Sequence, residues 1–207
     1  MSTPTHARRG RPAPSRGSDP PAHAGTVAEV LNEIEAATDR RTRRAMLPER
    51  NLVAALITLD RDRAAEVLSL VTTADFEDHL SAVIAALIRV IACERGEPPS
   101  PQAVFALTRS LGPKLTEFHV SENRIAQELT EVYTLGLPIT VWSSARQVVE
   151  DSYRRRLGAG FTRGKQMCDT YADIPAIEAH ITEAREPLLA HRERLITLTH
   201  RAATNTP

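Results

Sequence analysis

The chain has 207 residues, of which 42% are hydrophobic and 25% are charged. This composition is too apolar for a fully disordered protein, and the length suits one domain with tails better than two independent domains. The 26 basic side chains are balanced by 26 acidic ones, which excludes the overall positive field of a dedicated nucleic-acid binder and leaves only local contacts with DNA.

Disulfide, membrane and export signals are also missing from the sequence. The two cysteines, Cys93 and Cys168, are too few for a disulfide framework and are expected to be reduced thiols. No apolar run reaches the roughly 18 residues that a membrane span requires. Because no hydrophobic segment follows the N-terminal arginines, a signal peptide is not expected either. These features predict a cytoplasmic protein without membrane contact.

The N-terminal part of the chain predicts two segments that do not belong to the main core. Residues 1–25 are a mixture of Pro, Arg, Gly, Ser, His and Ala, typical of a disordered tail. Its few arginines could touch phosphate, but a solubilising tail is the favoured interpretation. Residues 26–47 carry a short amphipathic pattern and then an arginine cluster, which predicts a short helix and a basic linker.

Residues 48–135 carry apolar side chains at helical spacing and are predicted to form a helical core. Pro48 suits the first turn of a helix, and a second short helix is predicted from Asp62 to Leu70, with Ala65, Leu68 and Val71 directed inward. The clearest amphipathic face follows and is expected at the centre of the core. It consists of Leu80, Val83, Ile84, Leu87, Ile88 and Ile91.

Start and stop signals divide the rest of this core into helices. Gly96 and the prolines after it end the central helix, and Ser100 before a proline is a typical cap for the next one. Gly112 ends that helix, Ser121 starts another, and Gly136 marks the following turn.

Residues 136–200 are predicted to form long helices arranged as a hairpin, followed by a flexible tail at residues 201–207. The first long helix is expected to fray or bend around Gly158 and Gly160, and the second to kink or split at Pro187. Because no segment alternates like a strand, the sequence predicts an all-α fold of about six to eight helices. We expect a compact multi-helix domain followed by a helical hairpin.

Four pieces of the chain resemble, in their order and separation, the N-terminal domain of DnaB-type replicative helicases. They are the opening helix Glu49–Leu56, the Asp75–Phe76 pair before the large apolar helix, the turn Gly96–Pro101, and the late helix Ala145–Leu157. The resemblance covers about residues 48–168. In that family the domain precedes a RecA-like ATPase, for which this sequence has no room, so we expect no motor.

Possible catalytic sites are weak. Residues 159–166 are a near match to a phosphate-binding loop, but Gln166 replaces the hydroxyl residue that holds magnesium, which favours a helix break instead. The acidic cluster at residues 75–79 could hold a metal ion, but acids at a helix N-terminus are the favoured interpretation. Neither cysteine has a base nearby in the sequence. We therefore expect no enzyme activity, cofactor or metal.

The candidate partner-binding residues lie in the late helices. Arg146, Arg154 and Arg155 could meet phosphates or an acidic partner, or they could form a solvated face balanced by neighbouring acids. The resemblance implies that the helical hairpin associates one N-terminal domain with another. Since an apolar helix face shared between chains is a common route to a symmetric dimer, we expect Ile177 and Ile181 to contribute to self-association.

Three functional hypotheses follow from the sequence. The leading one is a non-catalytic module of DNA replication that self-associates, as a dimer or larger oligomer, or docks onto the replicative helicase or primase of a primosome. The alternative is a DNA-binding accessory or regulatory protein that uses its arginine-rich tail and late helix. A third is a degenerate helicase fragment without a retained role.

Overall fold

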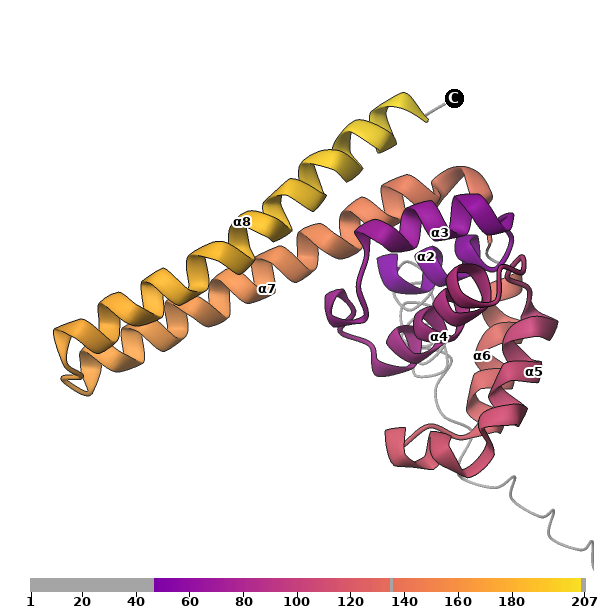
Figure 1. Ribbon diagram of the computed structural model, residues 1–207, viewed down its shortest axis with the longest axis horizontal. Coiled ribbons are helices and arrows are strands. Elements are labelled where there is room, and N and C mark those ends of the chain that lie inside the picture. Colours follow the sequence, from indigo (N-terminus) through magenta and orange to yellow (C-terminus); the bar gives the residue numbers. More distant parts are fainter. Residues whose placement is uncertain (1–46, 135, 206–207) are drawn as a thin grey trace, which may run out of the picture. The chain divides into compact units, whose positions relative to one another are not determined.

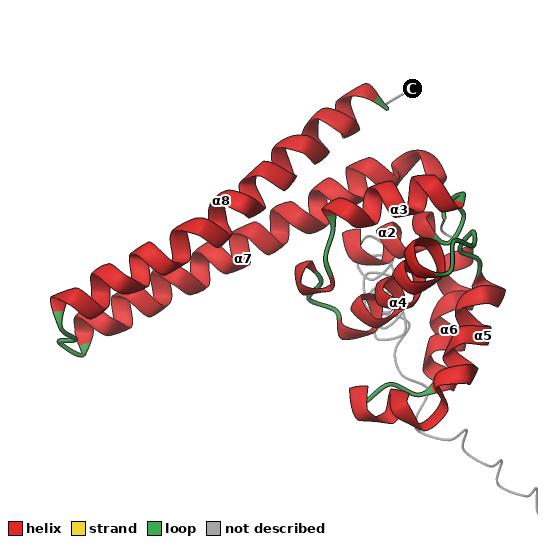
Figure 2. Ribbon diagram, viewed as in Figure 1, coloured by secondary structure: helices red, strands yellow, loops and turns green. Residues whose placement is uncertain are grey.

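The computed structural model describes residues 47–134 and 136–205, which form seven α-helices and no strand (Figures 1 and 2). This confirms the predicted all-α fold class. The predicted tail at residues 1–25 and nearly all of the segment at residues 26–47 lie outside the described residues. The helices are α2 (Pro48–Leu56), α3 (Arg61–Leu70), α4 (His79–Arg89), α5 (Pro101–Leu111), α6 (Glu122–Tyr133), α7 (Val141–Asp169) and α8 (Ile174–Thr204).

Side-chain caps fix the beginnings of four of these helices. Asp60, Asp78, Ser100 and Ser121 each accept a hydrogen bond from the backbone N–H of the third residue beyond them. Each cap satisfies one of the N–H groups that have no partner within the first turn. The starts predicted at Ser100 and Ser121 are therefore confirmed.

Glycines allow two of the turns between helices. Gly112 ends α5 with a φ of 48°, in the left-handed region that side chains rarely adopt. Gly136 lies so close to α2 that a Cβ atom there would be 2.5 Å from the carbonyl oxygen of Ala54. The turn after α6 can therefore pack on α2 only because residue 136 has no side chain.

The core is built around α2, whose residues Leu52–Leu56 are almost completely buried. It packs against α4, α6 and the first part of α7. The predicted face of α4 is confirmed, with five of its six residues buried and Val83 half-buried. In α3 the prediction is confirmed for Leu68 and for Val71 just beyond the helix, which are buried, but it is wrong for Ala65, which is half-buried, while Ala64 and Val67 are buried. The short apolar pattern of this helix does not distinguish Ala64 from Ala65 as the inward residue. Packing of α3 against the helical turn Val90–Glu94, which follows α4, decides between them.

The helix α7 belongs to both the core and the hairpin. Val141, Trp142, Val148 and Val149 are buried, so the first part of α7, which follows the boundary predicted at residue 136, packs in the core. Beyond the core, α7 continues beside α8 (Figure 1). Two antiparallel long helices confirm the predicted hairpin.

Neither long helix is interrupted where fraying or splitting was expected. The helix α7 runs through Gly158 and Gly160 to Asp169 without a break. A helical glycine costs only about 1 kcal/mol relative to alanine, which packing against α8 can offset. Likewise, α8 is not split at Pro187. The Glu183 carbonyl that loses its donor there belongs to an exposed residue, so water can satisfy it.

The helix α8 also extends further than expected. Residues 201–204, predicted to begin a flexible tail, are its last turn. Within the described ranges, none of the helices has the length and apolarity needed to cross a membrane.

Candidate interaction surface

The free end of the hairpin is a tight turn that leaves hydrophobic side chains uncovered. The N–H groups of Tyr171 and Ala172 donate to the carbonyls of Cys168 and Met167, at 3.1 and 2.9 Å, which closes α7 with a Schellman motif. Tyr171 occupies the left-handed position usual for glycine, with a φ of 54°. Its side chain is 94% exposed, and Ile174 beside it is also exposed.

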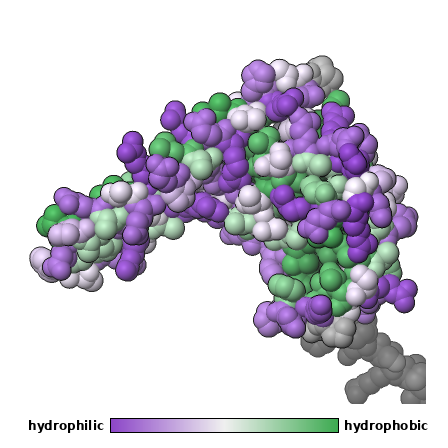
Figure 3. Space-filling model, viewed as in Figure 1, coloured by the Kyte–Doolittle hydropathy of each residue, from purple (hydrophilic) through white to green (hydrophobic). Residues whose placement is uncertain are grey.

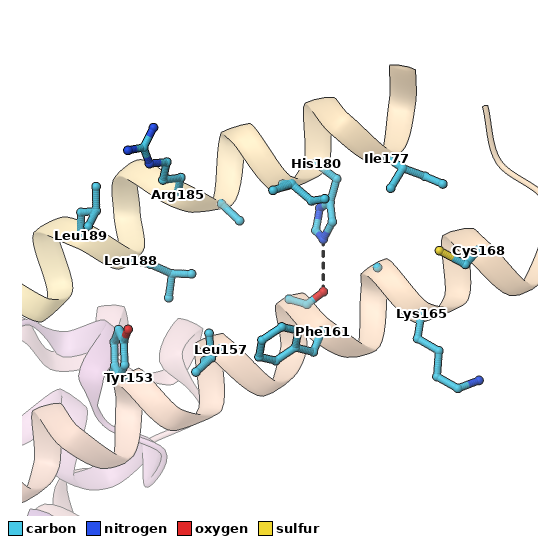
Figure 4. Close-up of a pocket in the computed structure, with 14 residues that line it drawn as sticks. Tyr153, Leu157, Phe161, Lys165, Cys168, Ile177, His180, Arg185, Leu188 and Leu189 are labelled. Carbon is cyan, nitrogen blue, oxygen red and sulfur yellow. Dashed lines mark hydrogen bonds between the residues drawn. The ribbon is translucent and has the colours of Figure 1, made fainter. Parts of the chain in front are cut away.

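An apolar groove of about 550 Å³ follows the contact between the outer halves of α7 and α8. Leu157, His180 and Leu188 point between the two helices, and the Nε2 atom of His180 lies 3.2 Å from the carbonyl oxygen of Gly160 (Figure 4). Phe161 and Ile181 also line the groove but remain 71% and 63% exposed. Two helices alone therefore do not bury the apolar residues that they bring together.

A second apolar groove, of about 600 Å³, continues this surface toward the core. Leu195, Ile196 and Ala203 line it from α8, and Tyr153 lines both grooves. From Ile177 to Ala203 the apolar surface follows α8 for about 39 Å at 1.5 Å per residue. The space-filling view shows hydrophobic residues among hydrophilic ones along the hairpin and at its free end (Figure 3).

The sequence of α8 explains this surface, because its apolar residues repeat every seven positions. Such spacing is typical of helices that pack in coiled coils and bundles. Near the core the repeat is covered, and Leu198 is fully buried, whereas Ile174 and Ile181 at the other end are exposed. The two rows are Ile174, Ile181, Leu188, Leu195 and Ala202, and Ile177, Ala184, His191 and Leu198.

The structure separates the five predicted partner-binding residues into two groups. Ile177 and Ile181 lie together in the groove. Arg146 and Arg154 lie nearer the core, where both form ion pairs with Glu150. The involvement of all five in partner binding stays a prediction, but two of the arginines already have an acidic partner one helical turn away.

The third arginine is tied to the core. Arg155 donates to the carbonyl oxygen of Asp75 at 2.6 Å and forms an ion pair with Glu77 at 3.3 Å. These contacts hold α7 against the turn before α4. A phosphate could bind there only by competing with bonds within the chain.

A buried polar cluster that was not predicted from the sequence lies where α8 meets the core. The carboxylate of Asp75 is fully buried and accepts bonds from Arg194 at 2.6 and 3.1 Å, from the Thr72 N–H at 2.7 Å, and from the Ser152 hydroxyl at 3.1 Å. His191 is also buried and lies beside Arg194. A signal was present, because His191 interrupts an otherwise apolar row of the seven-residue repeat.

Burial by itself raises the pKa of Asp75. The hydrogen bonds from Arg194 and from Thr72 outweigh that effect and hold the pKa below its ordinary value of 3.8. The carboxylate therefore stays ionised throughout the neutral and mildly acidic range. Its charge is compensated by Arg194, as a buried carboxylate requires.

Ser152, Asp75 and His191 have the residue types of a hydrolase triad but not its connections. The Ser152 hydroxyl donates to Asp75 rather than to the histidine, and the histidine bonds the Val149 carbonyl. Because Ser152 and His191 are each 1% exposed, a substrate cannot reach them. The geometry is that of a structural cluster.

The structure also places the two other candidate sites, the near match to a phosphate-binding loop and the acidic cluster at residues 75–79. Residues 159–166, the near match to a phosphate-binding loop, are helical, so their backbone N–H groups serve the helix and cannot cradle a phosphate. In the acidic cluster, Asp78 caps α4, as predicted for acids at a helix N-terminus, and His79 contacts the Phe118 carbonyl. Within the described part of the chain, no three His, Cys, Asp or Glu side chains could together hold a metal ion.

Comparisons of the chain with protein-family models, with curated proteins and with solved structures find no match. The uncovered hairpin surface is thus the observation from which a function can be inferred.

Proposed function

We propose that this protein is a non-catalytic interaction module of DNA replication, similar to the N-terminal domain of DnaB-type helicases. It self-associates through the α7–α8 hairpin or uses the same surface to dock onto a replicative helicase or primase. The observation that carries the proposal is the apolar surface of the hairpin, on which Phe161 and Ile181 remain mostly exposed. Contiguous apolar patches of this kind mark interaction sites.

A second copy of the chain is the simplest cover for this surface. Two hairpins related by a twofold axis form a four-helix bundle, in which each apolar row faces another. Burying Phe161, Ile174 and Ile181 in both copies contributes on the order of 10 kcal/mol. Association costs about 4 to 15 kcal/mol in lost freedom of motion. A reversible, concentration-dependent dimer is therefore the expected outcome.

The resemblance supports the replication context of the proposal. In the helicase family the corresponding hairpin joins N-terminal domains to one another, and here an α-helical core is followed by a hairpin with an uncovered face. The arginines of the late helix favour DNA less, because Arg146, Arg154 and Arg155 have acidic or carbonyl partners within the chain.

Sedimentation velocity over a range of concentrations tests self-association. The wild-type protein should show a mass that rises with concentration, and the double variant Ile177→Ser/Ile181→Ser should weaken association by at least about tenfold, or 1.4 kcal/mol. The control is Ile139→Ser, which removes an equally exposed isoleucine outside the hairpin and should associate like wild type.

A protein that stays monomeric at high concentration, and binds no helicase or primase, would contradict the proposal. If that monomer also bound DNA tightly, with an affinity that falls steeply as salt rises, the alternative of a DNA-binding accessory protein would replace it.

A further inference from the structure

The part of α8 nearest the core is attached to it by a buried leucine and by polar side chains. Leu198 is buried in the core, and Arg201 pairs with Glu66 at the surface. Arg194 reaches across to the carbonyl oxygen of Leu70 at 3.0 Å and to the Asp75 carboxylate. Arg194 therefore provides the main polar attachment between α8 and the rest of the core.

In the arrangement seen here, the contacts of the histidine next to this arginine fit only one protonation state. Nε2 of His191 lies 2.8 Å from the carbonyl oxygen of Val149, which only accepts, so Nε2 carries the hydrogen. Nδ1 lies 3.2 Å from Nη2 of Arg194, which only donates, so Nδ1 must offer its lone pair. The closed arrangement requires a neutral imidazole.

We propose that His191, Arg194 and Asp75 form a proton-operated latch, in which protonation of His191 releases this part of α8 from the core. A proton on Nδ1 would direct an N–H group at the guanidinium of Arg194, where no acceptor remains. Arg194 must then move away, and it loses its bonds to Asp75 and to the Leu70 carbonyl with the same movement.

The charges around His191 oppose a second positive charge in this place. Arg194 lies on the same helix, and Arg156 and the ring of Tyr153 face the histidine from α7. Among the described residues, the one acid that faces it is Asp75, 3.9 Å from Nε2, and this carboxylate is already bonded by Arg194. The protonated imidazole would thus compete with Arg194 for one carboxylate.

The direction of the pH effect follows from these contacts. Burial lowers the pKa of His191 below its ordinary value of 6.5; the bond to the Val149 carbonyl opposes this shift, and the charge of Arg194 adds to it. The released state, with the ordinary pKa, binds the proton more tightly than the closed state. The latch is therefore fully stable above pH 6.5, and each pH unit below that value favours release by up to about tenfold. Below the lowered pKa of His191 in the closed state, a further fall in pH no longer favours release.

Release would also change the proposed interaction surface, and this consequence rests on the proposed function. Tyr153, whose ring centroid lies 5.5 Å from that of His191, lines both grooves. Leu195 and Ile196, on the part of α8 that would be released, line the groove nearer the core. Protonation of His191 should therefore weaken hairpin-mediated association.

Trp142, the only tryptophan of the chain, reports on the latch directly. It is 3% exposed, and the guanidinium of Arg201 on α8 lies 5.7 Å from the centre of its ring. If α8 leaves the core, the Trp142 ring becomes exposed to solvent. Its emission in the full chain should shift to the red between about pH 7.5 and pH 5, with a midpoint below 6.5, while circular dichroism shows retained helicity.

Two variants test whether protonation of His191 causes this shift of the Trp142 emission. His191→Gln keeps an amide that can donate to Val149 and accept from Arg194 but takes up no proton, so the shift should vanish. His200→Gln changes an exposed histidine of the same helix and should leave the shift unchanged. Because His191→Gln could fold poorly, the imidazole Cε1–H resonance of wild-type His191 is followed as well, and its titration midpoint should lie below the ordinary value of 6.5.

Three results would each overturn the latch: a Trp142 shift that persists in His191→Gln, a Trp142 emission that does not change down to about pH 5, or a His191 resonance whose midpoint lies at or above 6.5. Sedimentation at about pH 7.5 and pH 5 separates this inference from the proposed function. If the protein is a monomer at both pH values but still shows the His191-dependent Trp142 shift, the latch is supported and self-association is contradicted. If the protein is a dimer but shows no Trp142 shift, self-association is supported and the latch is contradicted.

Discussion

The core and the hairpin use the same kind of amphipathic helix with opposite results. In the core, the five consecutive residues Leu52–Leu56 are nearly inaccessible to solvent because α2 has helices on several sides. In the hairpin, each helix has one neighbour, and Phe161 and Ile181 stay mostly exposed. The number of packing partners, rather than the apolar pattern, therefore decides whether such a stripe is buried. The same pattern stabilises the fold in one region and offers a binding surface in the other.

The largest expected effect comes from placing a charge in each region. Leu87→Asp introduces a carboxylate into the buried face of α4 and should cost about 4 kcal/mol or more, enough to unfold the domain. Ile181→Asp, on the hairpin, should leave the monomer's unfolding free energy nearly unchanged. Thermal unfolding followed by circular dichroism at a concentration that favours monomers compares the two. A Leu87→Asp protein with native melting would contradict the assignment of the core.

A smaller effect is expected where the two regions are joined. Arg194→Ala leaves the fully buried Asp75 carboxylate without its cation and should cost about 3 kcal/mol, because breaking one side of a buried pair leaves an uncompensated charge. Arg201→Ala removes an exposed pair with Glu66 and the contact of the guanidinium with the Trp142 ring and should cost about 1 kcal/mol. Urea unfolding measures both. Equal costs would mean that the buried cluster does not hold α8.

The smallest effect concerns two glycines of α7 that differ in their position relative to the groove. A Cβ atom at Gly158 or Gly160 meets nothing within 4 Å in the chain, so alanine at either position should stabilise the helix by up to about 1 kcal/mol. Only Gly160 lines the groove. Gly160→Ala should therefore weaken association in sedimentation experiments if a partner approaches this backbone, whereas Gly158→Ala should not. Equal association of both variants would place the partner elsewhere.

Local sequence signals were sufficient to predict most of the helices. Ser100 and Ser121 could be recognised as caps because capping depends on residues only three positions apart. The face of α4 follows from helical periodicity alone, and so do the all-α class and the apolar residues Ile177 and Ile181 that line the groove. These features need no knowledge of what lies across the molecule.

Tertiary packing decided the rest. Gly158, Gly160 and Pro187 weaken helices, yet α7 and α8 continue through all three, because each helix packs against the other and local propensity is worth only a few kcal/mol. The partnership of Asp75 with Arg194 joins residues 119 positions apart, and no local pattern encodes that separation. The protonation state of His191 depends in turn on that pair. The sequence by itself therefore determined the helices and their apolar faces, whereas the structure decided which faces are covered and where a charge is buried.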